Sequence, residues 1–320
     1  MIALPTAADV GAAAARIAPW VQPSPLQPSA WLSAAHGCEV RLKLECWQPT
    51  GSFKLRGAMA ALTALAPTER ARGVVAASAG NHGQAIAWGA RALGLPATIV
   101  VPLTASPAKI AALRTYPVEL VLHGADYDTA EAFGRQLAAE RGLPFISPYN
   151  DAAVIAGQGT LAAELLAAWP EVDMVVVPSG GGGLLAGVAL ALATLRPGVA
   201  VWGVEPAASP TMAQALARGG IGPVAEGPTL ADGLAGNIEA GSISYPLAAA
   251  HAAGVVLVDE PAIRAAMRGA AEHERLILEG SAAVAPAGLA QLDVAGKRVA
   301  VVLTGRNVAL PVFLGAIALP

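Results

Sequence analysis

Charged residues, aromatic residues and cysteines are all scarce in this 320-residue sequence. Asp, Glu, Lys and Arg make up only 13% of it and the formal net charge is −3, so we expect no basic surface that would attract nucleic acid or an anionic membrane. The two cysteines, Cys38 and Cys46, cannot make a disulfide framework, and we interpret each as a buried thiol. The six tryptophans are scattered and form no stacking platform for single-stranded nucleic acid.

Signals for export, membrane insertion and metal binding are also missing. Residues 1–26 lack the basic start and the continuous apolar core of a signal peptide. The most apolar stretches, 174–177 and 184–195, are much shorter than a membrane span of about 20 residues. The histidines share no metal-ligand spacing, so no metal site is expected. These absences predict a cytoplasmic protein without a membrane partner.

What the sequence does contain is the pattern of an α/β protein. It is 55% hydrophobic and rich in Ala and Gly, which suits strands covered by helices on both faces. Residues 207–245 have many Gly and Pro and little periodicity, and we expect them to form a long functional loop. Strands that alternate with helices predict parallel sheets with right-handed crossovers. From residue 73 onward, Ala-rich helical stretches separate predicted strands at 73–78, 97–102, 118–124, 144–148, 173–179, 199–206, 255–260 and 298–304.

Two segments directly follow predicted strands, where α/β sheets collect their ligands. Residues 179–184 (SGGGGL) allow successive backbone N–H groups to converge on an anion at the start of a helix, although a tight turn explains them equally well. They match neither GxGxxG nor GxxxxGK[ST], which argues against a nicotinamide dehydrogenase. Residues 78–84 (SAGNHGQ) offer N–H groups and a small hydroxyl for a carboxylate, but locally an Asx-type helix cap is the simpler interpretation.

A third segment, residues 48–57 (QPTGSFKLRG), places Lys54 between a turn and a mostly apolar helix. Lysines are ordinarily solvated charges. A lysine that is partly desolvated at such a position has a lowered pKa and can act as an amine nucleophile.

Together these segments resemble the fold-type II pyridoxal-phosphate (PLP) enzymes, and within them the serine/threonine dehydratase and serine racemase group. QPTGSFKLRGA is similar to the signature around the cofactor-binding lysine, SAGNHGQ to the substrate-carboxylate loop and SGGGGL to the phosphate cup. AGQGT (156–160), EGS (279–281) and LTGRN (303–307) follow in the order expected for this group. The resemblance runs from about residue 20 to residue 308, which is nearly the whole chain.

The resemblance implies an α/β fold of two open parallel-sheet domains of the tryptophan synthase β-like kind, with PLP in the cleft between them. Residues 1–65 and 151–320 would form the large PLP-binding domain. Residues 66–150 would form the small domain that carries the substrate-carboxylate loop. The resemblance also implies a homodimer that acts on a small amino-acid substrate.

The resemblance further assigns roles to individual residues. Lys54 would bind PLP as a Schiff base and later remove the substrate's Cα proton, with Phe53 packed against the cofactor ring. Thr304 would face the pyridine nitrogen, and a hydroxyl there holds no proton on that nitrogen, which favours elimination over transamination. The other cofactor contacts would come from Asn81 at the phenolic hydroxyl, from Glu279, and at the phosphate from Gly180, Gly181, Gly182, Gly183 and Leu184. The substrate carboxylate would be bound by Ser78, Ala79, Gly80, Asn81 and His82.

The implied function is β-elimination of water, followed by loss of ammonia, from L-threonine or L-serine to give 2-oxobutyrate or pyruvate. Racemases of this group usually place a second serine where this sequence has Ala79. Because alanine cannot exchange a proton, we expect a dehydratase rather than a serine or aspartate racemase. A PLP-binding protein without turnover is a third alternative, which the joint presence of Lys54, Asn81 and Thr304 argues against.

Other positions leave details open. Relatives that bind a divalent cation have a glutamate followed six residues later by an aspartate; here Glu205 is followed by Thr211, and a strand-end glutamate is the simpler interpretation. Arg306 stands where a small residue is usual. It is either a surface arginine or a charge that admits an acidic substrate such as threo-3-hydroxyaspartate. Tyr149 either borders the substrate's side chain or serves packing alone.

Overall fold

The computed structural model describes residues 3–318, which contain one sheet of six strands and one of three. The strands are β1 (Leu26–Pro28), β2 (Glu39–Lys43), β3 (Val74–Ala77), β4 (Ala97–Val101), β5 (Glu119–Leu122), β6 (Met174–Pro178), β7 (Ala200–Pro206), β8 (Gly254–Val258) and β9 (Arg298–Val302). The larger sheet has the order β1-β2-β9-β6-β7-β8 and is parallel except between β1 and β2. The smaller sheet, β3-β4-β5, is parallel throughout. The predicted α/β fold with parallel sheets is confirmed.

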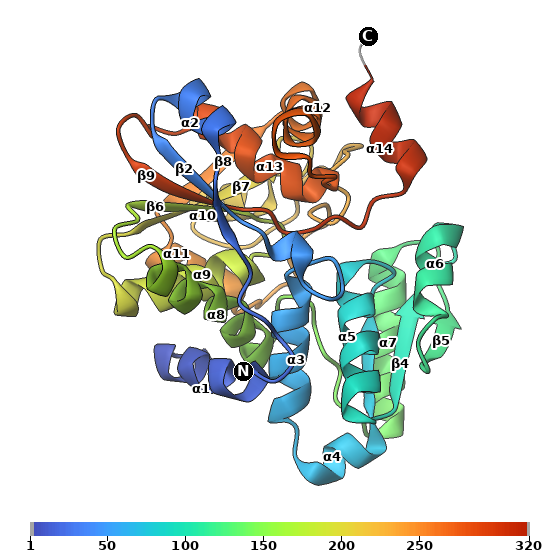
Figure 1. The fold of residues 1–320 in the computed structure, drawn as a ribbon. Coiled ribbons are helices and arrows are strands. Elements are labelled where there is room, and N and C mark those ends of the chain that lie inside the picture. The colour runs from blue at the N-terminus through green and yellow to red at the C-terminus, as the bar shows by residue number, and fades with distance from the viewer. Residues whose placement is uncertain (1–2, 319–320) are drawn as a thin grey trace.

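Helices cover both sheets (Figure 1). They are α1 (Ala7–Ile17), α2 (Ala30–His36), α3 (Lys54–Ala64), α4 (Pro67–Arg72), α5 (Asn81–Leu93), α6 (Pro107–Leu113), α7 (Tyr127–Arg141), α8 (Ala152–Ala168), α9 (Gly183–Leu195), α10 (Thr211–Arg218), α11 (Ser244–His251), α12 (Glu260–Gly269), α13 (Gly280–Gly288) and α14 (Leu310–Ile317). Single turns occur at η1 (Glu45–Trp47), η2 (Ala270–Glu274) and η3 (Leu289–Gln291). Within residues 3–318, no helix combines the length and apolarity needed to span a bilayer.

Each face of the six-stranded sheet has its own hydrophobic core. Along β6, Val175 and Val177 pack with α8 and α9, whereas Met174 and Val176 pack with α12 and α13 on the other face. This alternation follows from the two-residue period of a strand, which sends successive side chains to opposite faces. Because both faces are covered, the central strands are apolar at almost every position, as a buried parallel sheet requires.

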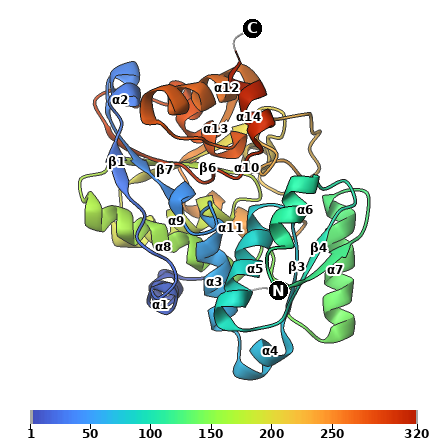
Figure 2. The same ribbon diagram turned by 45° about the vertical axis from the view of Figure 1, so that its right-hand side comes forward.

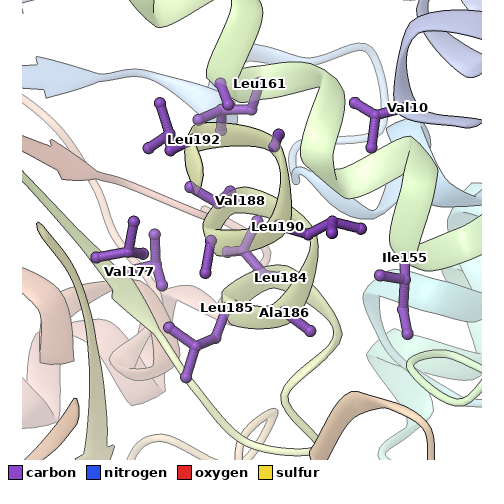
Figure 3. Packing of buried hydrophobic residues seen from close by; sticks show 14 of the residues in the cluster. Val10, Ile155, Leu161, Val177, Leu184, Leu185, Ala186, Val188, Leu190 and Leu192 are labelled. Carbon is purple, nitrogen blue, oxygen red and sulfur yellow. The ribbon is translucent and has the colours of Figure 1, made fainter. Parts of the chain in front are cut away.

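Helix α9 shows why the glycine-rich segment before it is held firmly. Its side chains from Leu184 to Leu192 are all buried, and Figure 3 shows them between Val177 of β6 and Ile155 and Leu161 of α8. A helix that is apolar on every side is stable only in a core. The N-terminus of α9 is therefore anchored by packing around the whole helix.

Helix α3 lies between the two sheets (Figure 2). Leu55 and Met59 pack in the core that α8 and α9 share, whereas Ala58 and Leu62 pack with α5 against the three-stranded sheet. Small residues allow α3 to pack closely against α8. A Cβ on Gly57 of α3, for example, would lie 2.3 Å from the Gln158 side chain of α8. Lys54 is thus the first residue of a helix that packs against the cores of both sheets.

Two sequence predictions about secondary structure were wrong. Residues 144–148, predicted as a strand, make only an isolated parallel bridge between Phe145 and Val75. Pro144 and Pro148 have no N–H to donate, so a longer ladder cannot form. Residues 207–245, predicted as a loop, include the whole of α10 and the start of α11. The many Gly and Pro residues around α10 obscured its eight-residue apolar pattern.

Candidate active site

The residues singled out in the sequence come together at the carboxyl ends of β3, β6 and β9. Asn81 begins α5 just after β3, the glycine-rich segment joins β6 to α9, and Thr304 follows β9. Glu279 directly precedes α13 and Lys54 begins α3. Ligands of open α/β sheets bind at the carboxyl ends of the strands, because loops there can carry side chains without disturbing the strands.

The loop before Lys54 is fixed by backbone hydrogen bonds to the segment that follows β9. Phe53 N–H donates to the Thr304 carbonyl at 2.9 Å, and Arg306 N–H donates to the Gly51 carbonyl at 3.0 Å. Gly51 has a φ of +72°, which favours glycine. These contacts set the point at which α3 begins and therefore the position of the lysine.

The amine of Lys54 lies in a largely desolvated position. Its Nζ donates to the Pro148 carbonyl at 3.0 Å and lies 5.1 Å from the centre of the Phe53 ring. Burial lowers the pKa of Lys54 to about 8, although the negative charge of Glu279 opposes the shift. A substantial neutral fraction near neutral pH makes this amine a usable nucleophile and base.

The glycine-rich segment leaves the N-terminus of α9 without a capping side chain. Gly182 has a φ of +82°, and a Cβ on Gly181 would lie 2.4 Å from the Tyr149 ring. Only glycine can follow this path, since one position needs a left-handed backbone and the other touches an aromatic ring. The free N–H groups and the positive end of the helix dipole suit an anion such as a phosphate.

Asn81 and Glu279 form a direct contact within the site. Asn81 Nδ2 donates to Glu279 Oε1 at 2.7 Å. Burial raises the pKa of Glu279 to about 7. Gly305 passes so close that a Cβ there would lie 2.1 Å from the same oxygen. The glycine of the LTGRN segment is therefore needed to make room for the carboxyl group.

The segment from Ser78 to His82 leads into α5 and supplies its first two residues. Ser78 Oγ accepts a hydrogen bond from Gly80 N–H at 3.1 Å, and no side chain caps the helix. The Asx-type cap considered from the sequence is thus absent, which leaves the first N–H groups of α5 available to a carboxylate. The His82 ring bonds the Ile146 carbonyl at 2.9 Å, and burial together with the nearby Lys54 charge lowers the pKa of His82 to about 3. This imidazole is neutral and acts in packing and loop position.

Glu205, considered as half of a cation site, caps a helix instead. Its carboxylate accepts hydrogen bonds from Met212 N–H at 2.8 Å and Ala213 N–H at 2.9 Å, at the start of α10. Thr211 donates its hydroxyl to the same carboxylate at 3.3 Å. Among the described residues, no group of three or more His, Cys, Asp or Glu side chains could hold a metal ion.

The two other open positions differ in exposure. The Arg306 side chain is exposed and makes no ion pair in the part of the chain that the structure describes. This exposure agrees with the interpretation of Arg306 as a surface arginine. Tyr149 packs against Gly181 and Gly183, and its hydroxyl accepts a hydrogen bond from Glu239 N–H at 3.2 Å. Packing against the glycine-rich segment thus accounts for Tyr149.

Sequence reasoning missed a buried ionic cluster around Arg56, two residues after Lys54. Arg56 is fully buried and bonds both oxygens of Glu45, at 2.7 and 2.9 Å, and both oxygens of Glu164, each at 2.7 Å. Lys43 Nζ lies 2.9 Å from Glu164 and balances the second carboxylate. Arg56 belongs to the QPTGSFKLRG segment, but nothing in the sequence near Glu45 or Glu164 marks them as its partners.

Comparison with known proteins supports the resemblance inferred from the motifs. A model of the family described as "Pyridoxal-phosphate dependent enzyme" matches residues 17–305. The chain is 42% identical to an L-threonine ammonia-lyase of Thermotoga maritima, over 88% of this chain and 70% of the relative. It is 38% identical to an L-threo-3-hydroxyaspartate ammonia-lyase of Saccharomyces cerevisiae, over 95% and 94% of the two chains.

A solved structure shows the same fold. Maize serine racemase superposes with a TM-score of 0.93 at 32% identity, over 98% of this chain and 97% of that one. The family match covers far more than half of the sequence, so the resemblance inferred from the motifs is confirmed. This chain belongs to the family of pyridoxal-phosphate dependent enzymes.

Proposed function

We propose that this chain is a PLP-dependent ammonia-lyase that converts L-threonine and L-serine to 2-oxobutyrate or pyruvate and ammonia. The observation that carries the proposal is the desolvated Lys54 amine, together with the uncapped N-termini of α5, which follows β3 of the small sheet, and of α9, which follows β6 of the large sheet. Similar proteins named for ammonia-lyase activity support the reaction type.

The residues of the site fit PLP. The cofactor needs an amine for its aldehyde, donors for its phosphate and a partner for its ring hydroxyl. Lys54, the α9 N-terminus and Asn81 offer these groups. In addition, the hydroxyl oxygens of Ser52 and Ser179 are buried without a hydrogen-bond partner in the structure. Buried polar groups normally have partners, and a phosphorylated ligand in this site can supply them.

The chain's own residues account for the remaining chemistry. When bound, PLP supplies an electron sink for the negative charge left at Cα. The first N–H groups of α5 bind the substrate carboxylate, and Lys54 Nζ takes the Cα proton. Thr304 would stand at the ring nitrogen, where a hydroxyl does not keep a proton, and this would favour elimination. The β-hydroxyl would leave as water with a proton returned by the Lys54 ammonium. The released enamine hydrolyses to the 2-oxo acid and ammonia.

The test is 2-oxo acid release by the purified protein with PLP, offered L-threonine, L-serine and threo-3-hydroxyaspartate. We expect turnover of threonine and serine without racemisation of recovered serine, because Ala79 cannot deliver a proton to the opposite face. Preference for hydroxyaspartate would move the assignment to the acidic substrate and give Arg306 a role. PLP binding with no oxo acid from any of the three would refute the lyase proposal.

We further propose that the protein is a cytoplasmic homodimer with a large domain, residues 1–65 and 151–320, and a small domain, residues 66–150. The end of α3 at Ala64 and the start of α8 at Ala152 support these boundaries. Sedimentation velocity would test the dimer, and limited proteolysis near the boundaries would test the domains.

The lowered pKa of Lys54 predicts how the apoprotein captures PLP. At pH 7, an amine with a pKa of about 8 is about 10% neutral, against about 0.03% for one at 10.5. Because only the neutral amine attacks an aldehyde, we expect the capture rate to rise with pH and level off above about pH 8. Stopped-flow absorbance of apoprotein mixed with PLP measures this profile. A rate still rising tenfold per pH unit at pH 9.5 would show that the amine has an ordinary pKa.

The Gly181→Ala substitution tests the glycine-rich segment. The added methyl group would collide with the Tyr149 ring and displace the loop. Overpacking of this kind costs about 1–3 kcal/mol, so we expect the dissociation constant of PLP to rise about tenfold or more. Quenching of tryptophan fluorescence on titration of the apoprotein measures this constant. Gly220→Ala, in open space after α10, is the matched control and should leave it unchanged.

A further inference from the structure

We propose that Asn307 is a positioning residue that locks the amide of Asn81 with its N–H side toward the cofactor. The inference rests on the proposed role of Asn81 as the partner of the cofactor's ring hydroxyl. Asn307 itself is the last residue of the LTGRN segment and was assigned no role from the sequence.

The orientation of the Asn307 amide follows from its partners. Asn307 Nδ2 donates to the Thr50 carbonyl at 2.8 Å and to Asn81 Oδ1 at 2.7 Å. A backbone carbonyl can only accept, so the NH₂ end of Asn307 must face Thr50. Its two hydrogens are both used, one for each acceptor. The side chain is also wedged in place, since a Cβ on Gly51 would lie 2.6 Å from Asn307 Oδ1.

The orientation of the Asn307 amide determines the orientation of the Asn81 amide. Because Asn81 Oδ1 accepts from Asn307, Asn81 Nδ2 must lie on the other side, where it donates to Glu279 at 2.7 Å. An amide nitrogen carries two hydrogens, and Glu279 takes one. The second remains for the ring hydroxyl. A flipped Asn81 would present an oxygen acceptor instead and lose this donor.

Glu279 alone cannot hold the amide near neutral pH. Its pKa is raised to about 7 by burial, so a considerable fraction of the carboxyl is protonated there and can donate as well as accept. The charged groups that act on it are Lys54 of α3 and the Lys109–Asp232 ion pair between α6 and the loop that follows α10. Asn307 does not titrate. It therefore keeps the donor side of Asn81 toward the cofactor at every pH in this range.

The test uses the holoenzyme and two readouts other than turnover. One is the absorbance spectrum of bound PLP from pH 6 to 9, and the other is the PLP dissociation constant. In Asn307→Asp, the carboxylate cannot donate to Asn81 Oδ1 and draws the NH₂ group toward itself. We expect a shifted spectrum and a dissociation constant raised at least tenfold. In Asn307→Ala, we expect a spectrum that changes with pH near 7, where that of the wild type does not.

A double-variant cycle separates positioning from general damage. Asn81→Ala should weaken PLP binding by itself, and adding Asn307→Asp should then change the dissociation constant less than twofold. Equal effects of Asn307→Asp in both backgrounds, or no effect in the wild type, would overturn the proposal. Where Asn307→Asp does not fold, Asn307→Ala, which also removes the donor, takes its place in the cycle under the same twofold limit. Arg306→Ala, exposed and adjacent, is the control.

The outcomes also separate this inference from the proposed function. A wild type that binds PLP but releases no oxo acid, with the Asn307 effect intact, contradicts only the lyase proposal. An Asn81→Ala protein with unchanged spectrum and affinity contradicts the role of Asn81 and this inference with it. Normal lyase activity with no Asn307 effect contradicts this inference alone.

Discussion

Replacing Lys54 with alanine should lower the rate of 2-oxo acid release from L-threonine by at least about 10³-fold. Lys54 is proposed to act twice, as the amine that holds PLP and as the base that takes the Cα proton. A positioned general base alone contributes about 10²–10⁴-fold to a rate, and loss of the covalent anchor adds to that. Steady-state assays at saturating PLP measure the effect.

The same assay includes a lysine control and a rescue experiment. Lys297 is a surface residue paired with Asp293, and Lys297→Ala should leave the rate within about twofold, as expected for an exposed pair. A small primary amine added to the Lys54→Ala protein should restore part of the rate, because it can replace the missing base. Full activity in Lys54→Ala without added amine would show that another group does the chemistry.

Replacing Arg56 with methionine should cost about 3–5 kcal/mol of folding free energy. The substitution keeps an unbranched, flexible apolar stem but removes the charge that faces two carboxylates. Glu45 is fully buried, so it would be left as an uncompensated charge in the core. Removing one partner of a buried ion pair has an effect of this size. Urea unfolding of both proteins, compared at unchanged m value, measures it.

A surface pair in the same protein supplies the matched control for Arg56. Arg298 bonds both oxygens of Asp173, at 3.0 and 2.8 Å, but both side chains are more than one-third exposed. Water screens such a pair, and Arg298→Met should cost at most about 1 kcal/mol. Equal losses for Arg56→Met and Arg298→Met would mean that burial does not strengthen the Arg56 cluster.

Much of the fold could be predicted from the sequence because its signals are local. The β-branched runs that became β3, β4, β6, β7 and β9 lie in strands covered on both faces, where almost every residue is apolar. The antiparallel edge formed by β1 and β2 was not predicted. β1 has three residues and contains a proline, too short a segment for periodicity to mark it. Helix α10 was missed for a related reason, since its eight residues stand among Gly and Pro.

In the candidate site too, some residues could be predicted from local sequence patterns and others could not. Lys54 and the glycine-rich segment could be singled out because a motif needs particular residue types at fixed spacing along the chain. The partners of Asn81 could not, because Glu279 lies 198 residues and Asn307 lies 226 residues further along the chain. Such contacts depend on how β3 and β9 are arranged in space. No local pattern records that arrangement.

From the sequence alone we could predict the α/β class, the order of the elements that carry the motifs, and Lys54 as the candidate for the reactive amine. Each of these depends on properties of consecutive residues, such as period, backbone freedom and side-chain chemistry. The contacts made on folding show that Glu205 caps a helix and that Arg56 is enclosed by two carboxylates, and they carry the proposal that Asn307 orients Asn81. In all three cases the role of a polar side chain depends on its hydrogen-bond partners. For Arg56 and Asn307, folding brings those partners from distant parts of the chain. For Glu205, the partners are the N–H groups that are free at the start of α10.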